Sequence, residues 1–314
     1  MHNFNNLFKI VFLGTGASIP SLKRGAPAVA LCYDNGILLF DCGEGTQMRL
    51  AQTGLSPFKI HTIFISHLHG DHIFGLPGFV TSQHMMNRPK PLTIYGPPGL
   101  QQFMNGVRNV TRYALNFPME MIELTPRPVS EIKCDIFKVI VRSLVHNSPC
   151  LGFRVEEPPK PGTFDAQKAK ERGIPEGPER KELINGRSVS IGKQIIHPDQ
   201  VVGDPIPGRI AAYCTDTRPC QQAELLANKS DLLIHESTFS DKFNDRAMET
   251  SHSTAREAAT VALHAETALL ALFHSSLRLQ HENSSDLLDE ASQVFPNTVL
   301  PNDFDELDIN RRER

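Results

Sequence analysis

The sequence lacks the features that mark membrane-spanning, secreted and disulfide-stabilised proteins. No apolar stretch among its 314 residues approaches the length that crosses a bilayer. The first residues lack the basic and apolar regions of a signal peptide. The six cysteines are scattered without a CxxC pair, so neither a cysteine-based zinc site nor a disulfide framework is indicated. We therefore expect a protein with reduced thiols, located in the cytoplasm and not in a membrane.

The sequence also lacks a strong excess of either charge. The net charge is −3, whereas nucleic-acid-binding proteins usually show a basic surface. This argues only weakly against a nucleic-acid partner, because local charge matters more than the total. The apolar fraction of 40% and the charged fraction of 21% are those of an ordinary globular protein that can bury a sizeable core.

Short apolar runs separated by glycine-rich turns predict many strands. The strands are expected at residues 8–13, 28–33, 36–40, 60–66, 92–95, 137–141, 209–214, 231–234 and 269–273. Asp34-Asn35-Gly36 predicts a hairpin turn between the second and third of these strands. Helices are expected at residues 45–52, 99–107, 220–228 and 253–265, the last of them capped by Ser253 or Thr254.

Residues 158–186 differ in character from the rest of the chain. They are rich in proline and glycine and poor in apolar residues, with one short helix expected at 164–172. Such a segment is typical of a projecting arm or a long loop, and a disordered surface loop is the alternative. Lys168, Lys170 and Arg172 are among its basic residues and could contact phosphates.

Residues 67–72, His-Leu-His-Gly-Asp-His, place four potential metal ligands within six positions, directly after a predicted strand. Three imidazoles and a carboxylate are costly to bury there, and a bound cation offsets that cost. His67 and His69 can turn to one side of the loop, while Asp71 and His72 can reach a second position nearby. A solvated histidine-rich turn is the alternative interpretation.

Three further candidate ligands share this placement. His146, Asp216 and His274 each come just after a predicted strand. Strand ends at one rim of a sheet are where sites converge in layered α/β folds. Seven imidazoles and carboxylates exceed the three protein ligands of one catalytic zinc, so we expect two cations, ~3.5–4 Å apart. Such pairs commonly act on phosphates, with a bridging hydroxide as the nucleophile.

The cluster matches the HxHxDH signature of the metallo-β-lactamase superfamily. Within it the sequence resembles the ribonuclease Z family, endonucleases that remove the 3′ trailer from precursor tRNA. The resemblance extends over nearly the whole chain. It is carried by GTGA at 14–17, FDCGEGTQ at 40–47, residues 65–78 ending in LPG, LTIYGP at 92–97, HESTF at 235–239 and SHSTA at 251–255.

The resemblance implies two zinc ions per subunit, for which Mn²⁺, Mg²⁺ or Co²⁺ could substitute. The ligands that it implies are His67, His69 and His146 for the first ion, Asp71, His72 and His274 for the second, and Asp216 as the bridge.

The resemblance also implies roles beyond metal binding. Asp71 would orient or deprotonate the attacking water. His252 is similar to the family's candidate proton donor to the leaving 3′ oxygen, and Glu236 would position it. Asp41 resembles a carboxylate that orients a metal-bound histidine. A plain turn aspartate is the alternative reading of Asp41.

The segment 158–186 is similar to the family's flexible arm, which grips the tRNA elbow away from the cut. Gly177 and Pro178 match its glycine-proline motif. The family acts as a homodimer in which the arm of one subunit holds RNA for the site of the other. A homodimer that binds precursor tRNA is therefore expected from the resemblance.

Two segments depart from the family pattern. The loop that usually reads PTKxRN is here Pro-Ser-Leu-Lys-Arg-Gly at 20–25, which keeps Pro20 and Arg24 but loses the asparagine. Arg24 remains a candidate substrate contact, while discrimination against mature CCA ends is left open. After His274 the usual SxRY is replaced by a displaced Arg278 without a tyrosine, so nearby phosphate contacts could differ.

We expect an α/β fold, the four-layer αβ/βα sandwich of the metallo-β-lactamase type, as a single domain over 1–314 with an inserted arm at 158–186. The leading hypothesis is a zinc-dependent endoribonuclease that leaves a 3′-hydroxyl on tRNA and a 5′-phosphate on the trailer. A general phosphodiesterase or exoribonuclease on the same di-metal scaffold is the alternative. A protein that binds RNA or stores metal without turnover is a third possibility.

Overall fold

The computed structural model describes residues 7–34, 36–276 and 285–311. The chain divides into two compact units, one formed by Met1–Glu156 and Ile210–Asn310 and the other by Glu157–Arg209 and Arg311–Arg314. The predicted arm at 158–186 lies within the second unit, which continues to Arg209. No helix in the described part of the chain is long and apolar enough to span a bilayer.

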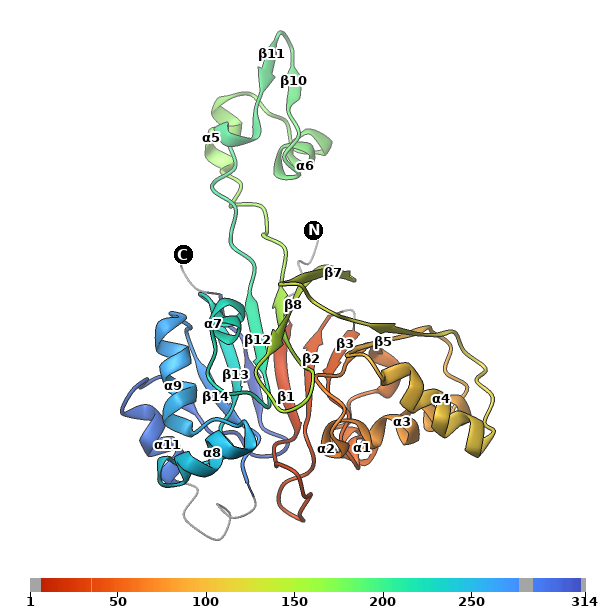
Figure 1. Cartoon of the computed structure of the whole chain (residues 1–314). Helices are drawn as coiled ribbons and strands as arrows, with labels where there is room; N and C mark the ends of the chain where they lie inside the picture. The colour runs from red at the N-terminus through yellow and green to blue at the C-terminus, as the bar shows by residue number, and fades with distance from the viewer. Residues whose placement is uncertain (1–6, 35, 277–284, 312–314) are drawn as a thin grey trace. The chain divides into compact units, whose positions relative to one another are not determined.

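The first unit contains two seven-stranded sheets (Figure 1). One sheet has the order β16-β1-β2-β3-β4-β5-β6, with the bounds Glu306–Asp308, Phe8–Gly14, Ala28–Tyr33, Gly36–Phe40, Ile60–Phe64, Leu92–Gly96 and Met119–Glu123. The other has the order β15-β14-β13-β12-β9-β8-β7, with the bounds Thr298–Val299, Leu270–Phe273, Leu232–Glu236, Ile210–Cys214, Cys150–Glu156, Phe137–Leu144 and Ser130–Cys134.

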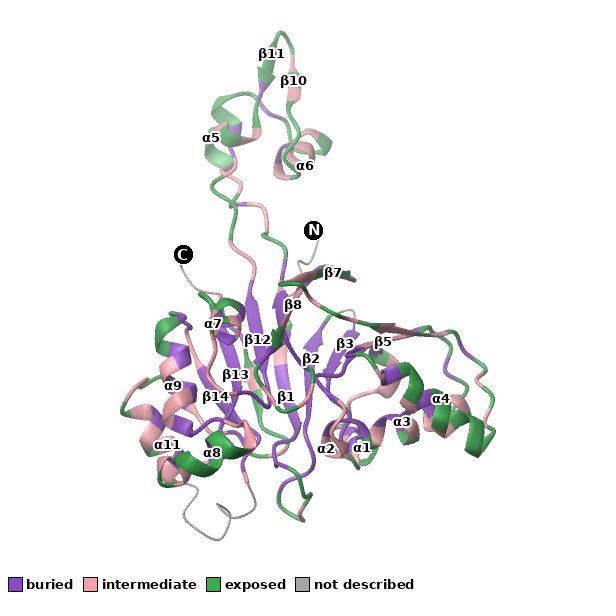
Figure 2. Cartoon of the chain, in the orientation of Figure 1, coloured by how far each residue is buried: buried purple, intermediate pink, exposed green. Residues whose placement is uncertain are grey.

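The sheets pack face to face through a core rich in aromatic rings. Phe40 of the first sheet lies 5.9 Å from Phe153 and 5.4 Å from Tyr213 of the second, measured between ring centroids. Figure 2 shows that the central strands of both sheets, such as β2, β3, β12 and β13, are buried along their length. Burying apolar surface contributes about 25 cal/mol per Å², so this aromatic layer contributes to the stability of the unit.

Helices cover the outer face of each sheet. Buried side chains of α1, α3 and α4 pack on the first sheet, and those of α7, α9 and α11 pack on the second. The helices of this unit are α1 (Thr46–Thr53), α2 (Gly70–Ile73), α3 (Gly75–Met85), α4 (Leu100–Thr111), α7 (Gln221–Ala227), α8 (Asn244–Thr250), α9 (Ala255–His264) and α11 (Ser285–Ser292). The layers run helix, sheet, sheet, helix, which confirms the predicted fold class.

The strand directions bring the functional segments to one edge of each sheet. β3, β4, β5 and β6 are parallel to one another, as are β12, β13, β14 and β15. β8 runs in the same direction as β12, because each is antiparallel to β9. The residues that follow β3 and β4 therefore lie at one end of the first sheet, and those that follow β8, β12, β13 and β14 lie at one end of the second. The carboxyl ends of parallel strands are where ligand sites form in such sheets.

The second unit has its own small core. Ala169, Ile174, Leu183, Ile196 and Val201 are buried together. Its elements are α5 (Ala166–Glu171), α6 (Pro178–Ile184) and the hairpin of β10 (Val189–Ile191) and β11 (Gln194–Ile196). The helix expected at 164–172 is thus present as α5.

The two ends of the second unit are held together by a buried ion pair. The Glu157 carboxylate accepts hydrogen bonds from Arg209 at 2.9 Å from Nε and 2.9 Å from Nη2. The backbone amide of Glu157 also donates to the Arg209 carbonyl. Burial opposes ionisation of Glu157, but the hydrogen bonds and charge of Arg209 outweigh burial and lower the pKa of the carboxyl.

Candidate metal centre

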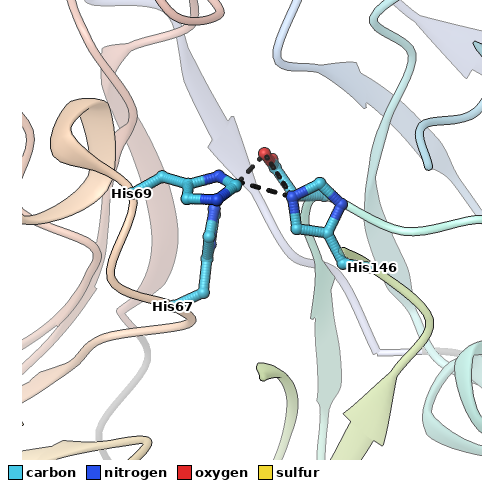
Figure 3. Close-up of side chains that lie close together, drawn as sticks. His67, His69 and His146 are labelled. Carbon is cyan, nitrogen blue, oxygen red and sulfur yellow. Dashed lines mark hydrogen bonds and ion pairs between the residues drawn. The ribbon is translucent and has the colours of Figure 1, made fainter. Parts of the chain in front are cut away.

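Four of the predicted ligands gather into one group. His67 and His69 follow β4, His146 follows β8 and Asp216 follows β12. One donor atom from each lies within 4.8 Å of the others. Figure 3 shows the imidazoles of His67 and His69 facing that of His146, although they come from different sheets. A cation between these groups would have three nitrogen donors and one oxygen donor, which suits zinc.

The other three predicted ligands form a second group. Donor atoms of Asp71, His72 and His274 also lie within 4.8 Å of one another. Asp71 and His72 belong to the short helix α2, and His274 follows β14. His274 Nε2 is 3.4 Å from Asp71 Oδ2.

The Asp216 carboxylate lies between the two groups. Its Oδ2 is 3.5 Å from His67 Nε2 and 3.9 Å from His146 Nε2. Its Oδ1 is 3.4 Å from His72 Nε2 and 3.3 Å from His274 Nε2. One oxygen therefore faces each group, which is the arrangement of a carboxylate that bridges two cations.

The pKa shifts of His67 and Asp216 fit a site that holds cations. His67 is fully buried, and its Nε2 has no hydrogen-bond partner among the described residues. Burial lowers the pKa of His67 well below its usual value, so the imidazole is neutral and can donate its lone pair. Burial would raise the pKa of Asp216, but the imidazoles of His274 and His72 outweigh it and hold the pKa low. An orphaned buried nitrogen facing a carboxylate is what a metal would satisfy.

Asp41 contacts one member of the second group, His72, through the ring nitrogen that does not face the other candidate ligands. It follows β3 and its Oδ2 lies 2.8 Å from His72 Nδ1. The carboxylate also accepts hydrogen bonds from the Ser66 amide, the Ser66 hydroxyl and the Tyr213 hydroxyl. These contacts fix the orientation of the His72 ring and leave its Nε2 directed to the centre.

His252 and Glu236 form a hydrogen-bonded pair beside both groups. His252 Nδ1 is 2.8 Å from Glu236 Oε1, and Glu236 is fully buried at the end of β13. Burial would lower the pKa of His252, but the charge and hydrogen bond of Glu236 outweigh it and raise the pKa to about 9. The backbone amide of Thr217 donates to the same Glu236 oxygen at 2.9 Å and fixes its position.

Several supporting residues were not singled out from the sequence. The Thr238 hydroxyl donates to Glu236 Oε2 and lies 2.9 Å from His274 Nδ1. The Ser251 carbonyl accepts from His146 Nδ1 at 2.9 Å. Thr238 lies in HESTF at 235–239 and Ser251 in SHSTA at 251–255. These motifs carry the resemblance, so they are the sequence feature that could have pointed to the two residues. Nothing in the sequence pointed to Tyr213, which lies far from Asp41 along the chain.

The loop after β1 reaches the centre through its backbone. The Ser18 amide donates to Asp71 Oδ2 at 2.8 Å, with Ser18 in the left-handed region at φ 56°. Arg24, predicted to contact substrate, is buried instead among protein groups. Its guanidinium donates to the Thr15 hydroxyl and to the Pro301 carbonyl. Any influence of Arg24 on RNA would therefore act through the position of this loop.

The predicted arm residues lie in the second unit. Lys168, Lys170, Arg172, Gly177 and Pro178 are all exposed. Gly177 has φ 143° and precedes α6, a backbone conformation that glycine adopts most easily, and Pro178 is the first residue of that helix. The displaced Arg278 lies outside the described residues.

Comparison with known proteins gives one matching family model and many similar curated proteins. A protein-family model described as "Anti-Pycsar protein Apyc1" matches residues 8–123, less than half of the chain. The curated protein "Ribonuclease Z" of Bacillus licheniformis is 42% identical over 307 residues, covering 96% of this chain and 99% of its own length.

Solved structures agree with this similarity. Human tRNase Z, short form, has a TM-score of 0.69 and 28% sequence identity, covering 96% of this chain and 99% of its own. The metallo-β-lactamase fold protein YhfI of Bacillus subtilis has a TM-score of 0.68 at 16% identity, with 96% and 98% covered, and so shows the shared fold alone. The chain therefore belongs to the ribonuclease Z family and has the metallo-β-lactamase fold.

Proposed function

We propose that this protein is a zinc-dependent endoribonuclease that removes the 3′ trailer from precursor tRNA. The products would be a 3′-hydroxyl on the tRNA and a 5′-phosphate on the trailer. The observation that carries the proposal is the Asp216 carboxylate, with one oxygen toward each of two ligand groups, in a chain 42% identical to a ribonuclease Z.

Two zinc ions per subunit are proposed for the two groups, with Mn²⁺, Mg²⁺ or Co²⁺ as substitutes. The proposed ligands are His67, His69 and His146 for the first ion, Asp71, His72 and His274 for the second, and Asp216 as the bridge. The chemistry that such a pair supplies is a water of lowered pKa and neutralisation of charge on the phosphate oxygens.

The side chains around the pair divide the proton transfers. Asp71, held by the Ser18 amide at 2.8 Å, orients the attacking water and accepts its proton. His252 donates a proton to the 3′ oxygen that leaves, because its hydrogen bond to Glu236 favours the protonated ring. A mechanism through a 2′,3′-cyclic phosphate is disfavoured, since this arrangement needs no attack by the ribose 2′-hydroxyl.

Substrate recognition is proposed for the second unit. The exposed Lys168, Lys170 and Arg172 would contact phosphates of the tRNA, and release of counterions from those contacts would add to affinity. Gly177 and Pro178 would shape the turn that presents them. A homodimer is carried over from the resemblance, and size-exclusion chromatography with light scattering tests it, with a monomer as the contradicting result.

A cytoplasmic location is part of the same proposal. All six cysteines are free thiols, five of them buried, which fits a reducing compartment. Fractionation of cells that express the protein checks this, and recovery outside the cytoplasm would contradict it.

The decisive test is digestion of precursor tRNA followed by sequencing of both new ends. We expect one cut at the trailer junction, with a 3′-hydroxyl upstream and a 5′-phosphate downstream. Precursors with and without an encoded CCA should be compared, because the loop at 20–25 departs from the family pattern. A cyclic phosphate, or no cleavage, would contradict the proposed endonuclease. Stepwise shortening from the 3′ end would favour the exoribonuclease alternative.

A further inference from the structure

A cavity of about 270 Å³ lies beside His252 at the edge of the metal centre. Its described walls come from four separate segments of the first unit, one of them Ser276 after β14. Another is the loop after β1, one follows β13, and the fourth is α8 with the residues after it. This volume is close to the lower end of the ~300–1,000 Å³ that small-molecule sites occupy.

The lining of the cavity suits an anionic, partly apolar ligand. Ser18, Thr250 and Ser276 bring hydroxyl-bearing side chains, and Arg246 brings a guanidinium. None of the described residues that line it carries a carboxylate. The ring of Phe239 forms an apolar part of the wall. A nucleotide matches this lining, because it has an anionic phosphate, hydroxyl groups and a flat base.

Arg246 is free to exchange its present partner for a phosphate. Its Nη1 is 3.1 Å from Glu249 Oε2, one turn along α8. The two side chains are 51% and 65% exposed, and an ion pair so exposed contributes little to stability. A phosphate offers the planar guanidinium two parallel hydrogen bonds, which a solvated carboxylate on the same helix turn does not secure.

The position of the cavity indicates which nucleotide it would take. A proton donor must lie within hydrogen-bond reach of the oxygen that leaves. His252 lines the cavity, so a ribose whose 3′ oxygen accepts its proton would lie at the mouth of the cavity. We infer that the cavity binds the nucleotide on the 5′ side of the cut, and that Arg246 binds the phosphate on the far side of that nucleotide. This assignment rests on the proposed function.

The experiment compares wild type with Arg246→Ala and Arg246→Lys. Steady-state cleavage of a precursor tRNA gives KM and kcat, and the Kd of the tRNA product is measured from low to moderate salt. For Arg246→Ala we expect KM and Kd to rise by about 5- to 20-fold, because a charge-assisted contact is lost. The slope of log Kd against log salt should become shallower by about 0.7–1, the value of one phosphate contact.

Arg246→Lys and two further variants, Glu249→Gln and Arg108→Ala, sharpen the comparison. Arg246→Lys keeps the charge, so it should retain the salt slope while losing part of the affinity. Glu249→Gln removes the competing carboxylate and should lower Kd. Arg108→Ala, at an exposed position on α4 that lines no part of the cavity, is the matched control and should leave KM and Kd unchanged.

The outcomes separate this inference from the proposed function. An unchanged salt slope in Arg246→Ala would overturn the role of Arg246, even if wild type cleaves precursor tRNA as proposed. A shallower slope in a protein that does not cut precursor tRNA would overturn the proposed function and retain the phosphate contact. Equal losses in Arg246→Ala and Arg108→Ala would show a general charge effect and overturn the assignment to this cavity.

Discussion

Asp41 is fully buried, and protein donors occupy both of its oxygens. It has the left-handed backbone conformation, with φ 56°, directly after β3. From there it accepts from Ser66 and Tyr213 and holds the His72 ring at 2.8 Å. A buried carboxylate is costly unless its lone pairs are used, so these donors are the reason Asp41 can hold His72, a candidate metal ligand, from the interior.

Replacing Asp41 by Asn should weaken metal binding without unfolding the protein. Asparagine tolerates the left-handed conformation and keeps the size, but it removes the negative charge behind His72. We expect affinity for zinc to fall by about 10–100-fold, as for other supporting residues of metal ligands. Competition with a chelator measures the affinity. Tyr213→Phe, which removes one donor to Asp41, should have a smaller effect, and an unchanged affinity in Asp41→Asn would contradict this role.

Removal of the metal should abolish cleavage and reveal the stoichiometry. We expect the purified protein to contain two zinc ions per chain by elemental analysis. Prolonged dialysis against a chelator should eliminate cleavage of precursor tRNA, and added Zn²⁺ or Mn²⁺ should restore it. The melting temperature should fall on dialysis, because a ligand bound only to the folded state stabilises it. Full activity of the metal-free protein would contradict the assignment of the two groups.

At the scale of single elements, α9 is capped by Thr254, one of the two residues that the sequence predicted, and this cap forms a capping box with Glu257. The Thr254 hydroxyl accepts from the Glu257 amide, and the Glu257 carboxylate accepts from the Thr254 amide at 2.9 Å. The buried alanines of this helix pack on the second sheet. Its first turn therefore anchors the segment that carries His252, two residues earlier in the chain.

Thr254→Ala should lower the free energy of unfolding by about 1 kcal/mol, because the first turn of α9 loses its cap. Urea denaturation followed by circular dichroism measures the change. Thr254→Ser keeps a hydroxyl that can cap and should lose much less. If both variants are equally destabilised, the methyl group of Thr254 and not its cap is responsible.

The elements that the sequence predicted are those with a local signal. Strands such as β4 and β14 are short, continuous apolar runs, and α9 has both a capping box and helical periodicity. α3 was not predicted, since Gly75, Pro77 and Gly78 at its start disfavour a helix. Its burial of Phe79 and Val80 on the sheet outweighs that local preference. β16 was also missed, because a strand of three residues is defined only by its pairing with β1.

The candidate site shows the same contrast between features with a local sequence signal and features that depend on tertiary packing. The ligand candidates were found because histidines and aspartates after strands form a recognisable pattern, and the structure brings all seven together. The contacts of Tyr213 with Asp41 and of the Ser18 amide with Asp71 were not predicted. The first contact depends on the packing of the two sheets, and the second depends on a left-handed residue in a loop. A sequence pattern encodes neither.

At the scale of the whole molecule, residues 157–209 of the second unit are an insertion between two strands that pair with each other. β9 and β12 are antiparallel, and Glu156 is opposite Ile210 in their register. The strands of the first unit therefore do not need the inserted residues to find their partners. Glu157 and Arg209 close the insertion at its base.

Replacing residues 158–208 by a short glycine-serine linker should leave the first unit folded. We expect the variant to hydrolyse bis(p-nitrophenyl) phosphate at nearly the wild-type rate, because the seven candidate metal ligands all lie in the first unit. Cleavage of precursor tRNA should fall by roughly 100-fold or more through lost phosphate contacts. The triple variant Lys168→Ala, Lys170→Ala, Arg172→Ala should show part of that loss. Equal loss on both substrates would argue against a recognition role and favour a defect in the fold.

The seven candidate ligands span positions 67 to 274 of the chain, and the last of them follows β14. During synthesis the N-terminal sheet can form early, but the cluster is incomplete until that late strand has joined its sheet. A ribosomal product that stops before residue 274 would carry several histidines without a finished reaction centre. Incomplete chains released by aborted translation would therefore be inactive and would not cleave RNA in the cell.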